Sequence, residues 1–359
     1  MKIARVILNV VKNLLTSVGV FRSFAMFRMT LLLWCIPCFG YTQESFRVMF
    51  WNVENLFDTK DDPQKNDNEF LPDATRHWNF YRYRDKLKNL AKGIIASGNE
   101  YVPDLVGLCE VENDSCLYDL TRRSPLKEAG YRYIVTDSPD QRGIDVALLY
   151  QRGSFKVLQH QSIRIPNVNL KKNPTRDILH VVGKVVSGDT LDVLVCHMPS
   201  RSGGQGQSEP YRLLTAGILK QVVDSVMELR QHPYILVMGD FNDYPQNKSM
   251  KNLCSSGRLR NLMKGKKSGT YRYRGEWGIL DQFLVSENLL KKKGSIRTSS
   301  KKAQILQHPF LLEEDDKYGG NKPLRTYNGM RYLGGFSDHL PIVLDLELFI
   351  RDDKDYYSE

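Results

Sequence analysis

Short apolar runs of strand length recur along most of the chain, and they restrict its fold more than any other feature. In the first run, FRVMFWNV (46–53), alternate apolar residues share one face, as in a β-strand. Similar runs follow over 104–111, 144–150, 155–165, 178–186, 190–198, 234–240, 279–285 and 341–348. Helical spacing occurs over 80–97 and 211–230. With no internal repeat or long linker, the pattern predicts one α/β domain whose helices cover its sheets.

The first forty residues differ from the rest of the chain. They hold five basic residues and no acid, and they end in the apolar run MTLLLWCIPCFG. This predicts a secretory signal over 1–40, a folded domain over 41–359, and an exported (periplasmic or secreted) protein with no stable membrane insertion after processing. The alternative is a membrane anchor that is never removed. Without this segment the net charge falls from +10 to +5 (46 basic against 41 acidic residues), which favours an anionic partner.

Several apolar runs end in, or lead into, side chains that bind metals or move protons. These residues are Asn52, Glu54, Glu110, His197, Asp240, Asn242, Asp281, Asp338 and His339. A single such residue is usually a cap or a turn residue, but the repetition at six ends makes that interpretation strained. Because strand ends at one edge of a sheet are neighbours in space, we expect these side chains to converge.

This set of side chains indicates one kind of chemistry. Carboxylates and amides are hard oxygen ligands, which suit Mg²⁺, Mn²⁺ or Ca²⁺ better than zinc. Histidines supply a general base and a phosphate contact. The combination favours phosphoryl transfer, in which water attacks phosphorus and a metal neutralises developing charge. The sequence has neither a P-loop nor a Gly-x-Ser-x-Gly motif, which argues against nucleotide-driven chemistry and serine hydrolysis.

Seven segments carry a family likeness. They are, in order, WNVEN, GLCEVEN, RGIDVALLY, CHMPSR, MGDFND, LDQFLVS and FSDHLPI. They resemble the endonuclease/exonuclease/phosphatase superfamily, which includes pancreatic deoxyribonuclease, and the likeness extends from Phe46 to Leu348. It implies a four-layer α-β-β-α sandwich of two packed β-sheets with helices outside, in an exported member of bacterial type.

The resemblance also implies a metal centre. Glu110 is similar to the principal metal carboxylate of the superfamily, and Asn52 and Asp338 resemble the residues that complete the site. We expect Mg²⁺ or Mn²⁺, with Ca²⁺ as an alternative. Glu54 and Glu112 flank these residues and could either join the site or form structural salt bridges.

Five residues match catalytic positions of the superfamily. His339 resembles the histidine that transfers a proton, and Asp281 the residue that fixes its tautomer. Asp240 would orient or deprotonate the attacking water. Asn242 would hydrogen-bond the phosphoryl oxygens, and His197 would contact the scissile phosphate, with a role as a second acid left open.

The substrate is less tightly constrained than the reaction. The residues expected to contact it are Arg142, Arg201, Arg274 and Tyr327. The last two belong to strips of basic and aromatic residues (258–282 and 322–335), which favour nucleic acid, although a solvated loop explains them equally well. We predict a metal-dependent phosphodiester hydrolase, first of all an endonuclease. The alternatives are an enzyme acting on a small phosphoester and a non-catalytic binding protein.

Overall fold

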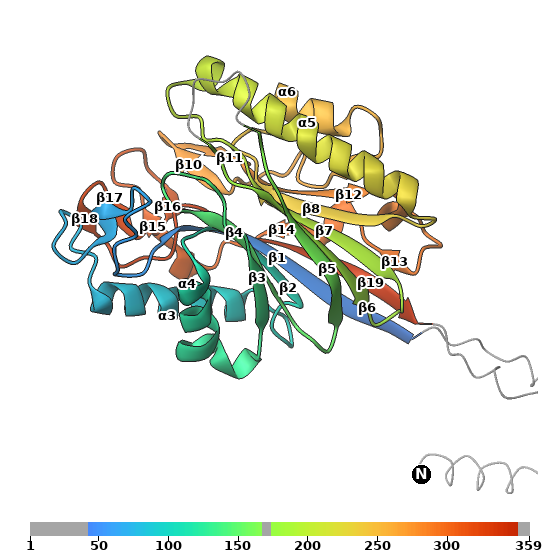
Figure 1. Cartoon of the computed structure of the whole chain (residues 1–359), viewed down its shortest axis with the longest axis horizontal. Coiled ribbons are helices and arrows are strands. Elements are labelled where there is room, and N and C mark those ends of the chain that lie inside the picture. The colour runs from blue at the N-terminus through green and yellow to red at the C-terminus, as the bar shows by residue number, and fades with distance from the viewer. Residues whose placement is uncertain (1–41, 167–173, 351–359) are drawn as a thin grey trace, which may run out of the picture. The chain divides into compact units, whose positions relative to one another are not determined.

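The computed structural model describes residues 42–166 and 174–350, so the predicted signal segment lies outside the described residues. Two β-sheets pack face to face, and helices cover the outer face of each (Figure 1). This is the four-layer sandwich that the resemblance implies. Within the described ranges, no helix has the length and apolar character needed to cross a membrane.

The first sheet has the order β13-β19-β1-β2-β4-β3, with β14 also paired to β19. Its strands are β1 (Thr42–Leu56), β2 (Leu105–Val111), β3 (Arg132–Val135), β4 (Asp145–Tyr150), β13 (Ile296–Arg297), β14 (Ala303–Ile305) and β19 (Ile342–Ile350). The central strands β1 and β2 run parallel, so their carboxyl ends meet at one edge of the sheet.

The second sheet has the order β5-β6-β7-β8-β12-β9. Its strands are β5 (Phe155–Ile163), β6 (Ile178–Val185), β7 (Thr190–His197), β8 (Tyr234–Asp240), β9 (Leu259–Asn261) and β12 (Asp281–Ser286). Strands β7 and β8 are parallel, whereas β12 is antiparallel to β8. The ends of β7 and β8 therefore lie beside the start of β12.

The apolar runs are buried on both faces. In β1, Val48 and Phe50 lie in the core between the sheets, whereas Met49 and Trp51 lie in the core that faces α3 (Phe80–Ala96). The short helix α4 (Asp114–Tyr118) adds to the same outer layer. This double burial explains why the strands are almost continuously apolar.

Helices α5 (Gln205–Leu229) and α6 (Lys248–Cys254) cover the second sheet. The sequence pattern predicted that the first of these begins at 211, but it begins six residues earlier. Pro210 falls in its second turn, and proline there obscured the true start, because proline normally marks the beginning of a helix.

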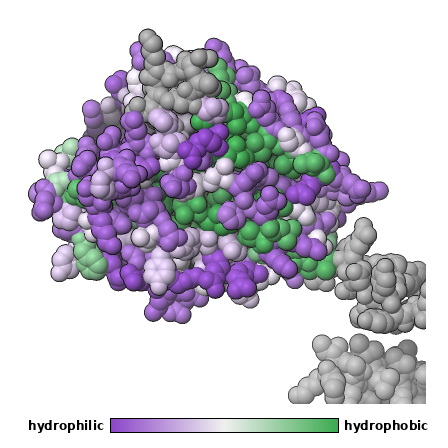
Figure 2. All heavy atoms as spheres, in the orientation of Figure 1, coloured by the Kyte–Doolittle hydropathy of each residue, from purple (hydrophilic) through white to green (hydrophobic). Residues whose placement is uncertain are grey.

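Three small hairpins gather beyond the strand ends, on the left of Figure 1. They consist of β10 (Tyr271–Tyr273) with β11 (Glu276–Gly278), β15 (Leu312–Glu314) with β16 (Asn321–Pro323), and β17 (Tyr327–Asn328) with β18 (Arg331–Tyr332). Strands of two or three residues are too short to show periodicity, so the sequence did not predict them. Figure 2 shows hydrophilic residues over this end and a hydrophobic band between the helical layers.

Candidate active site

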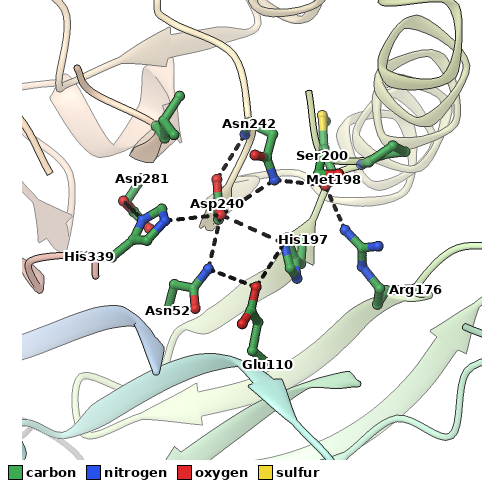
Figure 3. Close-up of polar contacts among 12 residues, drawn as sticks. Asn52, Glu110, Arg176, His197, Met198, Ser200, Asp240, Asn242, Asp281 and His339 are labelled. Carbon is green, nitrogen blue, oxygen red and sulfur yellow. Dashed lines mark hydrogen bonds and ion pairs between the residues drawn. The ribbon is translucent and has the colours of Figure 1, made fainter. Parts of the chain in front are cut away.

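The predicted polar residues meet where the same edges of the two sheets come together. In the second sheet, His197 pairs in register with Asp240, and Asp240 pairs with Asp281. In the first sheet, Asn52 lies beside the residue that precedes Glu110. The Asn52 amide donates to Asp240 Oδ2 at 3.1 Å and faces Glu110 Oε1 at 3.4 Å, which links the two sheets (Figure 3). The expected convergence is therefore present.

A buried aspartate–histidine pair forms one side of the site. His339 Nδ1 lies 2.7 Å from Asp281 Oδ2, and His339 Nε2 faces Asp240 Oδ2 at 3.9 Å. Ser337 Oγ accepts a hydrogen bond from the His339 amide and donates one to the Asn52 carbonyl, which fixes this segment against β1. Because Nδ1 is occupied, Nε2 is the atom that can exchange a proton with a substrate.

Burial and charge set different protonation states in the two histidines. Burial disfavours charged His339, but the Asp281 and Asp240 carboxylates outweigh it and raise the pKa of His339 well above its usual range. Burial lowers the pKa of His197 well below its usual range, and the Arg176 guanidinium lowers it further. Burial also raises the pKa of Asp240 to about 7. The His339 imidazole is therefore protonated and that of His197 is neutral at pH 7, so His197 has no proton to give as an acid.

Amides on both sides orient Asp240. The Asn242 backbone amide donates to Asp240 Oδ1 at 2.8 Å, and the Asn52 side chain donates to Oδ2. The side chain of Asn242 also donates to the Met198 carbonyl at 3.0 Å. Both carboxylate oxygens of Asp240 thus have fixed directions, as a carboxylate that orients water requires.

Glu110 is the carboxylate that the resemblance predicts as the main metal ligand. Its Oε2 accepts from the Asn55 amide at 3.0 Å, whereas its Oε1 lies 3.7 Å from Arg142 Nη2. Asp338 lines the same cleft. Carboxylate and amide oxygens are the donor set that Mg²⁺ or Mn²⁺ prefers, so these side chains have suitable chemistry, and their binding of an ion stays a prediction.

Two of the predicted ligands have competing partners in the structure. The Asn52 oxygen accepts from the Glu54 amide at 3.0 Å, so ligation by Asn52 requires its side chain to turn. Asp338 Oδ2 accepts from Arg325 Nη2 at 3.1 Å, and Arg325 also pairs with buried Glu54 at 3.0 Å. Glu54 thus forms a structural salt bridge.

A second group of possible metal ligands is more compact. One ligand atom from each of Asp240, Asp281 and His339 lies within 4.8 Å of the others. Asp281 and His339 already share a short hydrogen bond, which a shared cation would break. The geometry of this group therefore favours proton transfer over metal binding, and Glu110 as the main metal carboxylate stays a prediction.

Backbone strain marks the same region. Glu54, Asn55, Glu110 and Asn242 have positive φ values of 49°, 55°, 64° and 50°. Such conformations cost non-glycine residues of order 1–3 kcal/mol each and persist where surrounding structure enforces them. The strain turns the Asn55 amide toward Glu110 and the Asn242 amide toward Asp240.

A cleft of about 660 Å³ opens over these groups. Nine of the twelve predicted site residues line it: Asn52, Glu110, Arg142, His197, Arg201, Asp240, Asn242, Asp338 and His339. Asp281 lies behind His339 and is fully buried. The remaining two residues lie elsewhere.

Tyr327 and Arg274 do not line the cleft. Tyr327 is 4% exposed, packs in the core beneath α3, and donates its hydroxyl to the Arg76 carbonyl at 2.9 Å. Arg274 lies at the tip of the β10–β11 hairpin and stacks on Tyr273 at 5.2 Å. Tyr327 as a substrate contact stays a prediction: the residue lies outside the cleft but lines a separate pocket of about 240 Å³.

The basic segment 258–282 does not form one surface over the cleft. Arg258 pairs with a carboxylate of α5 at 2.9 Å, and Arg260 pairs with a carboxylate after β12 at 3.5 Å. Lys266 donates to a backbone carbonyl at 2.6 Å. From this segment, the cleft is lined by Tyr271, Tyr273 and Leu280. The structure therefore agrees with the solvated-loop interpretation for most of these charges.

Several supporting residues had no recognised signal in the sequence. Arg176 is buried and donates to the Met198 carbonyl at 2.7 Å, which supports the strand end at His197. Lys86 on α3 is 1% exposed, and its ammonium donates to Thr326 Oγ1 and to a carbonyl after β18, both at 2.6 Å. The sequence signal that could have identified Lys86 is its position on the apolar face of the predicted helix over 80–97, where a lysine is unusual.

Comparison with known proteins decides the family. A model of the Endonuclease/Exonuclease/phosphatase family matches residues 47–348. The chain belongs to this family. It is accordingly a phosphoesterase of the endonuclease/exonuclease/phosphatase superfamily, as the seven motifs predicted. No curated protein sequence matches the chain.

Solved structures of the same fold include three with informative names. The mannosyl-6-phosphatase of Bacteroides thetaiotaomicron is 15% identical, with a TM-score of 0.55 over 84% of this chain and 99% of its own. The catalytic domain of human Nocturnin with bound sulfate is 20% identical, with a TM-score of 0.53 over 87% and 99%. D. rerio TDP2 complexed with single-strand DNA product is 15% identical, with a TM-score of 0.51 over 84% and 99%. These likenesses establish the fold alone.

Proposed function

We propose that the chain is a metal-dependent phosphodiesterase that hydrolyses its substrate by attack of water on phosphorus. The observation that carries this proposal is the placement of the Asp281–His339 pair opposite Glu110 in one cleft, with Asp240 between them. A non-catalytic binding protein has no need of a buried, oriented proton-transfer pair.

In this proposal some residues hold the metal ion and others bind the phosphoryl group. Glu110 and Asp338, with Asn52 once its side chain turns, would hold Mg²⁺ or Mn²⁺, which when bound neutralises charge on the phosphoryl group. Neutral His197 would hydrogen-bond the phosphoryl oxygens, and so would the Asn242 side-chain amide once it turns away from the Met198 carbonyl.

Asp240 and His339 handle the protons in this proposal. Asp240 orients the attacking water and accepts its proton. As the bond from phosphorus to the leaving oxygen breaks, protonated His339 would donate its Nε2 proton to that oxygen, and the Asp281 carboxylate stabilises the charged imidazole.

A diester is supported by the shape of the site. A second cavity of about 550 Å³ adjoins the cleft, and both are lined by Glu110, Arg142 and Asp338. A phosphate bound at these shared residues could place one substituent in each cavity. A monoester would leave one of them unused.

Two substrate classes remain as proposals. Nucleic acid is favoured by Tyr244, Tyr271, Tyr273 and Arg201 in the cleft, since bases stack on aromatic rings and a related fold is known with single-strand DNA product. A small phosphoester is favoured by the dispersal of the basic segment 258–282 away from the cleft, and one relative is a mannosyl-6-phosphatase.

The test uses residues 41–359 with two substrates, supercoiled plasmid and bis(p-nitrophenyl) phosphate, each in Mg²⁺, Mn²⁺ or a chelator. Metal-dependent turnover that is lost in His339→Ala and in Glu110→Gln would support the reaction. Turnover in a chelator, or near-normal turnover in either folded variant, would contradict it. Cleavage of the small diester without nicking would exclude the endonuclease.

We also propose that residues 1–40 direct export. Their basic, apolar composition supports this. Expression of the full chain with N-terminal sequencing of the secreted or periplasmic product tests it, and an uncleaved chain in the membrane fraction would favour the anchor instead.

A further inference from the structure

The second cavity, here called the recess, is built by the loop after β1. Asn66, Asn68, Phe70 and Arg76 of this loop line it, together with Asn55 of β1. A deeper pocket of about 240 Å³ continues from it and shares Asn55, Phe70 and Arg76 with it. The recess is thus a formed polar cavity beside the proposed position of the scissile phosphate, and the proposed function leaves open the chemistry of the substituent that would occupy it.

The charges around the recess are balanced by the protein itself. The recess and the deeper pocket are lined by three arginines and four carboxylates. Arg76 pairs with Glu69 at 2.9 Å, and Arg142 lies 3.7 Å from Glu110. Arg325 pairs with two more carboxylates, as described above. If Glu110 and Asp338 hold the metal, Arg142 is left to contact the scissile phosphate itself, whereas Arg76 and Arg325 keep Glu69 and Glu54 as partners. A further phosphate would then meet no uncompensated cation among the described residues of the recess, which is unsuited to the next phosphate of a polynucleotide.

The cleft, unlike the recess, contains a cation that no carboxylate of the described residues neutralises. Arg201 lines the cleft and lies over the Tyr244 ring at 4.7 Å. It donates to the Gln205 side chain at 2.6 Å, and within 42–166 and 174–350 no carboxylate forms an ion pair with it. An anionic or aromatic substituent therefore fits the cleft, whereas the recess fits a neutral one.

The polar groups of the recess are suited to hydroxyls. Asn66 and Asn68 are exposed, and among the described residues no hydrogen bond engages either side-chain amide. Each amide offers both donors and an acceptor, as alternating hydroxyls require. The Arg76 guanidinium lies against the Phe70 and Tyr327 rings at 5.3 and 5.2 Å, which fixes it as part of the wall.

We propose that the recess binds an uncharged, hydroxyl-bearing ring, such as a sugar, esterified to the scissile phosphate. This inference rests on the proposed function and selects the small-phosphoester substrate class. The enzyme would then cleave a diester whose sugar occupies the recess and whose other substituent occupies the cleft.

The test compares two p-nitrophenyl phosphodiesters of equal charge. Their second substituent is a methyl group in one and a methyl glucoside, linked through its 6-oxygen, in the other. We expect kcat/KM to favour the glucoside diester by about tenfold, as two neutral hydrogen bonds would supply. Asn66→Ala with Asn68→Ala should remove this preference and leave kcat/KM for the methyl diester unchanged. Asn252→Ala, an exposed amide on α6, is the matched control and should retain it.

Binding measurements separate this inference from the reaction. Calorimetry with the inactive His339→Ala protein compares methyl glucoside 6-phosphate with n-hexyl phosphate, so no turnover is needed. Tighter binding of the glucoside phosphate that is lost in the double variant supports the recess, even if neither diester is hydrolysed. Equal affinities of the two phosphates in the His339→Ala protein, or equal kcat/KM values of the two diesters in the parent protein, overturn it. A preference that survives Asn66→Ala with Asn68→Ala also overturns it.

Discussion

Asp281→Asn is the sharpest test of the proposed proton transfer. The carboxylate of Asp281 contacts His339 Nδ1 at 2.7 Å, and its other oxygen is buried with no hydrogen-bond partner among the described residues. The substitution keeps the size of the side chain but removes the charge that supports the imidazolium. It therefore changes the electrostatics of His339 with little change in packing.

The magnitude follows from this geometry. Two unit charges about 4 Å apart interact by about 4 kcal/mol at an effective dielectric constant of about 20. An asparagine oxygen recovers part of this through a neutral hydrogen bond, so the net loss is about 2–4 kcal/mol. We expect kcat to fall about 30- to 1000-fold, since about 1.4 kcal/mol corresponds to a factor of ten. KM should change little, because Asp281 does not line the cleft.

The assay is hydrolysis of methyl n-hexyl phosphate between pH 6 and 10, followed by phosphorus NMR, because an alkoxide needs a proton to leave whereas p-nitrophenolate does not. Urea unfolding verifies the fold. The His339 pKa falls when the carboxylate is removed, so any decrease in rate that reflects loss of the imidazolium should move to lower pH. Asp192→Asn is the control, because Asp192 forms another buried pair with a histidine, His180, at 2.9 Å, away from the cleft. A folded Asp281→Asn enzyme with kcat within threefold of the parent would refute the assignment.

Three further outcomes are expected. Saturating Mg²⁺ at about ten times its Kd should stabilise the protein by about 1.4 kcal/mol in urea unfolding, and Glu110→Gln should remove this increment. Burial lowers the pKa of Lys86 to about 8, below an unfolded value near 10.4, so only the unfolded chain binds this proton between those pH values. The free energy of unfolding should therefore rise from pH 8 to 10 by up to about 3 kcal/mol relative to Lys86→Met. A parallel pH dependence in the two proteins would contradict this. Lys266→Ala should cost about 1–3 kcal/mol of stability but leave turnover of bis(p-nitrophenyl) phosphate and its salt dependence unchanged, because this lysine donates to the Ser300 carbonyl rather than to substrate.

The strands and the catalytic residues could be read from the sequence for the same physical reason. A strand buried on both faces must be apolar, so a polar residue at its end is conspicuous. His197, Asp240 and Glu110 each interrupt such a run, and the parallel arrangement of their strands brings those ends together. The sequence pattern and the strand order therefore place the same residues at the centre of the site.

The substrate residues could not be read in this way. Arg201 and Tyr327 occur in similar basic and polar contexts, yet one lines the cleft and the other is buried in the core. Loop conformation decides between these outcomes, and it depends on contacts distant in sequence, such as the hydrogen bond from the Tyr327 hydroxyl to the Arg76 carbonyl. The composition of a loop predicts neither its conformation nor these distant contacts.

Strain, burial and charge together explain why the recess lies where it does. The positive φ values at Glu54 and Asn55 bend β1 out of the sheet just beyond the metal-binding edge, so the following loop starts beside Glu110. That loop returns to α3 through Arg76, whose guanidinium donates to the Gly329 carbonyl at 2.9 Å. The same distortion that aims the Asn55 amide at Glu110 thus also opens a cavity next to it. One bend in one strand therefore sets both the proposed phosphate position and the recess beside it.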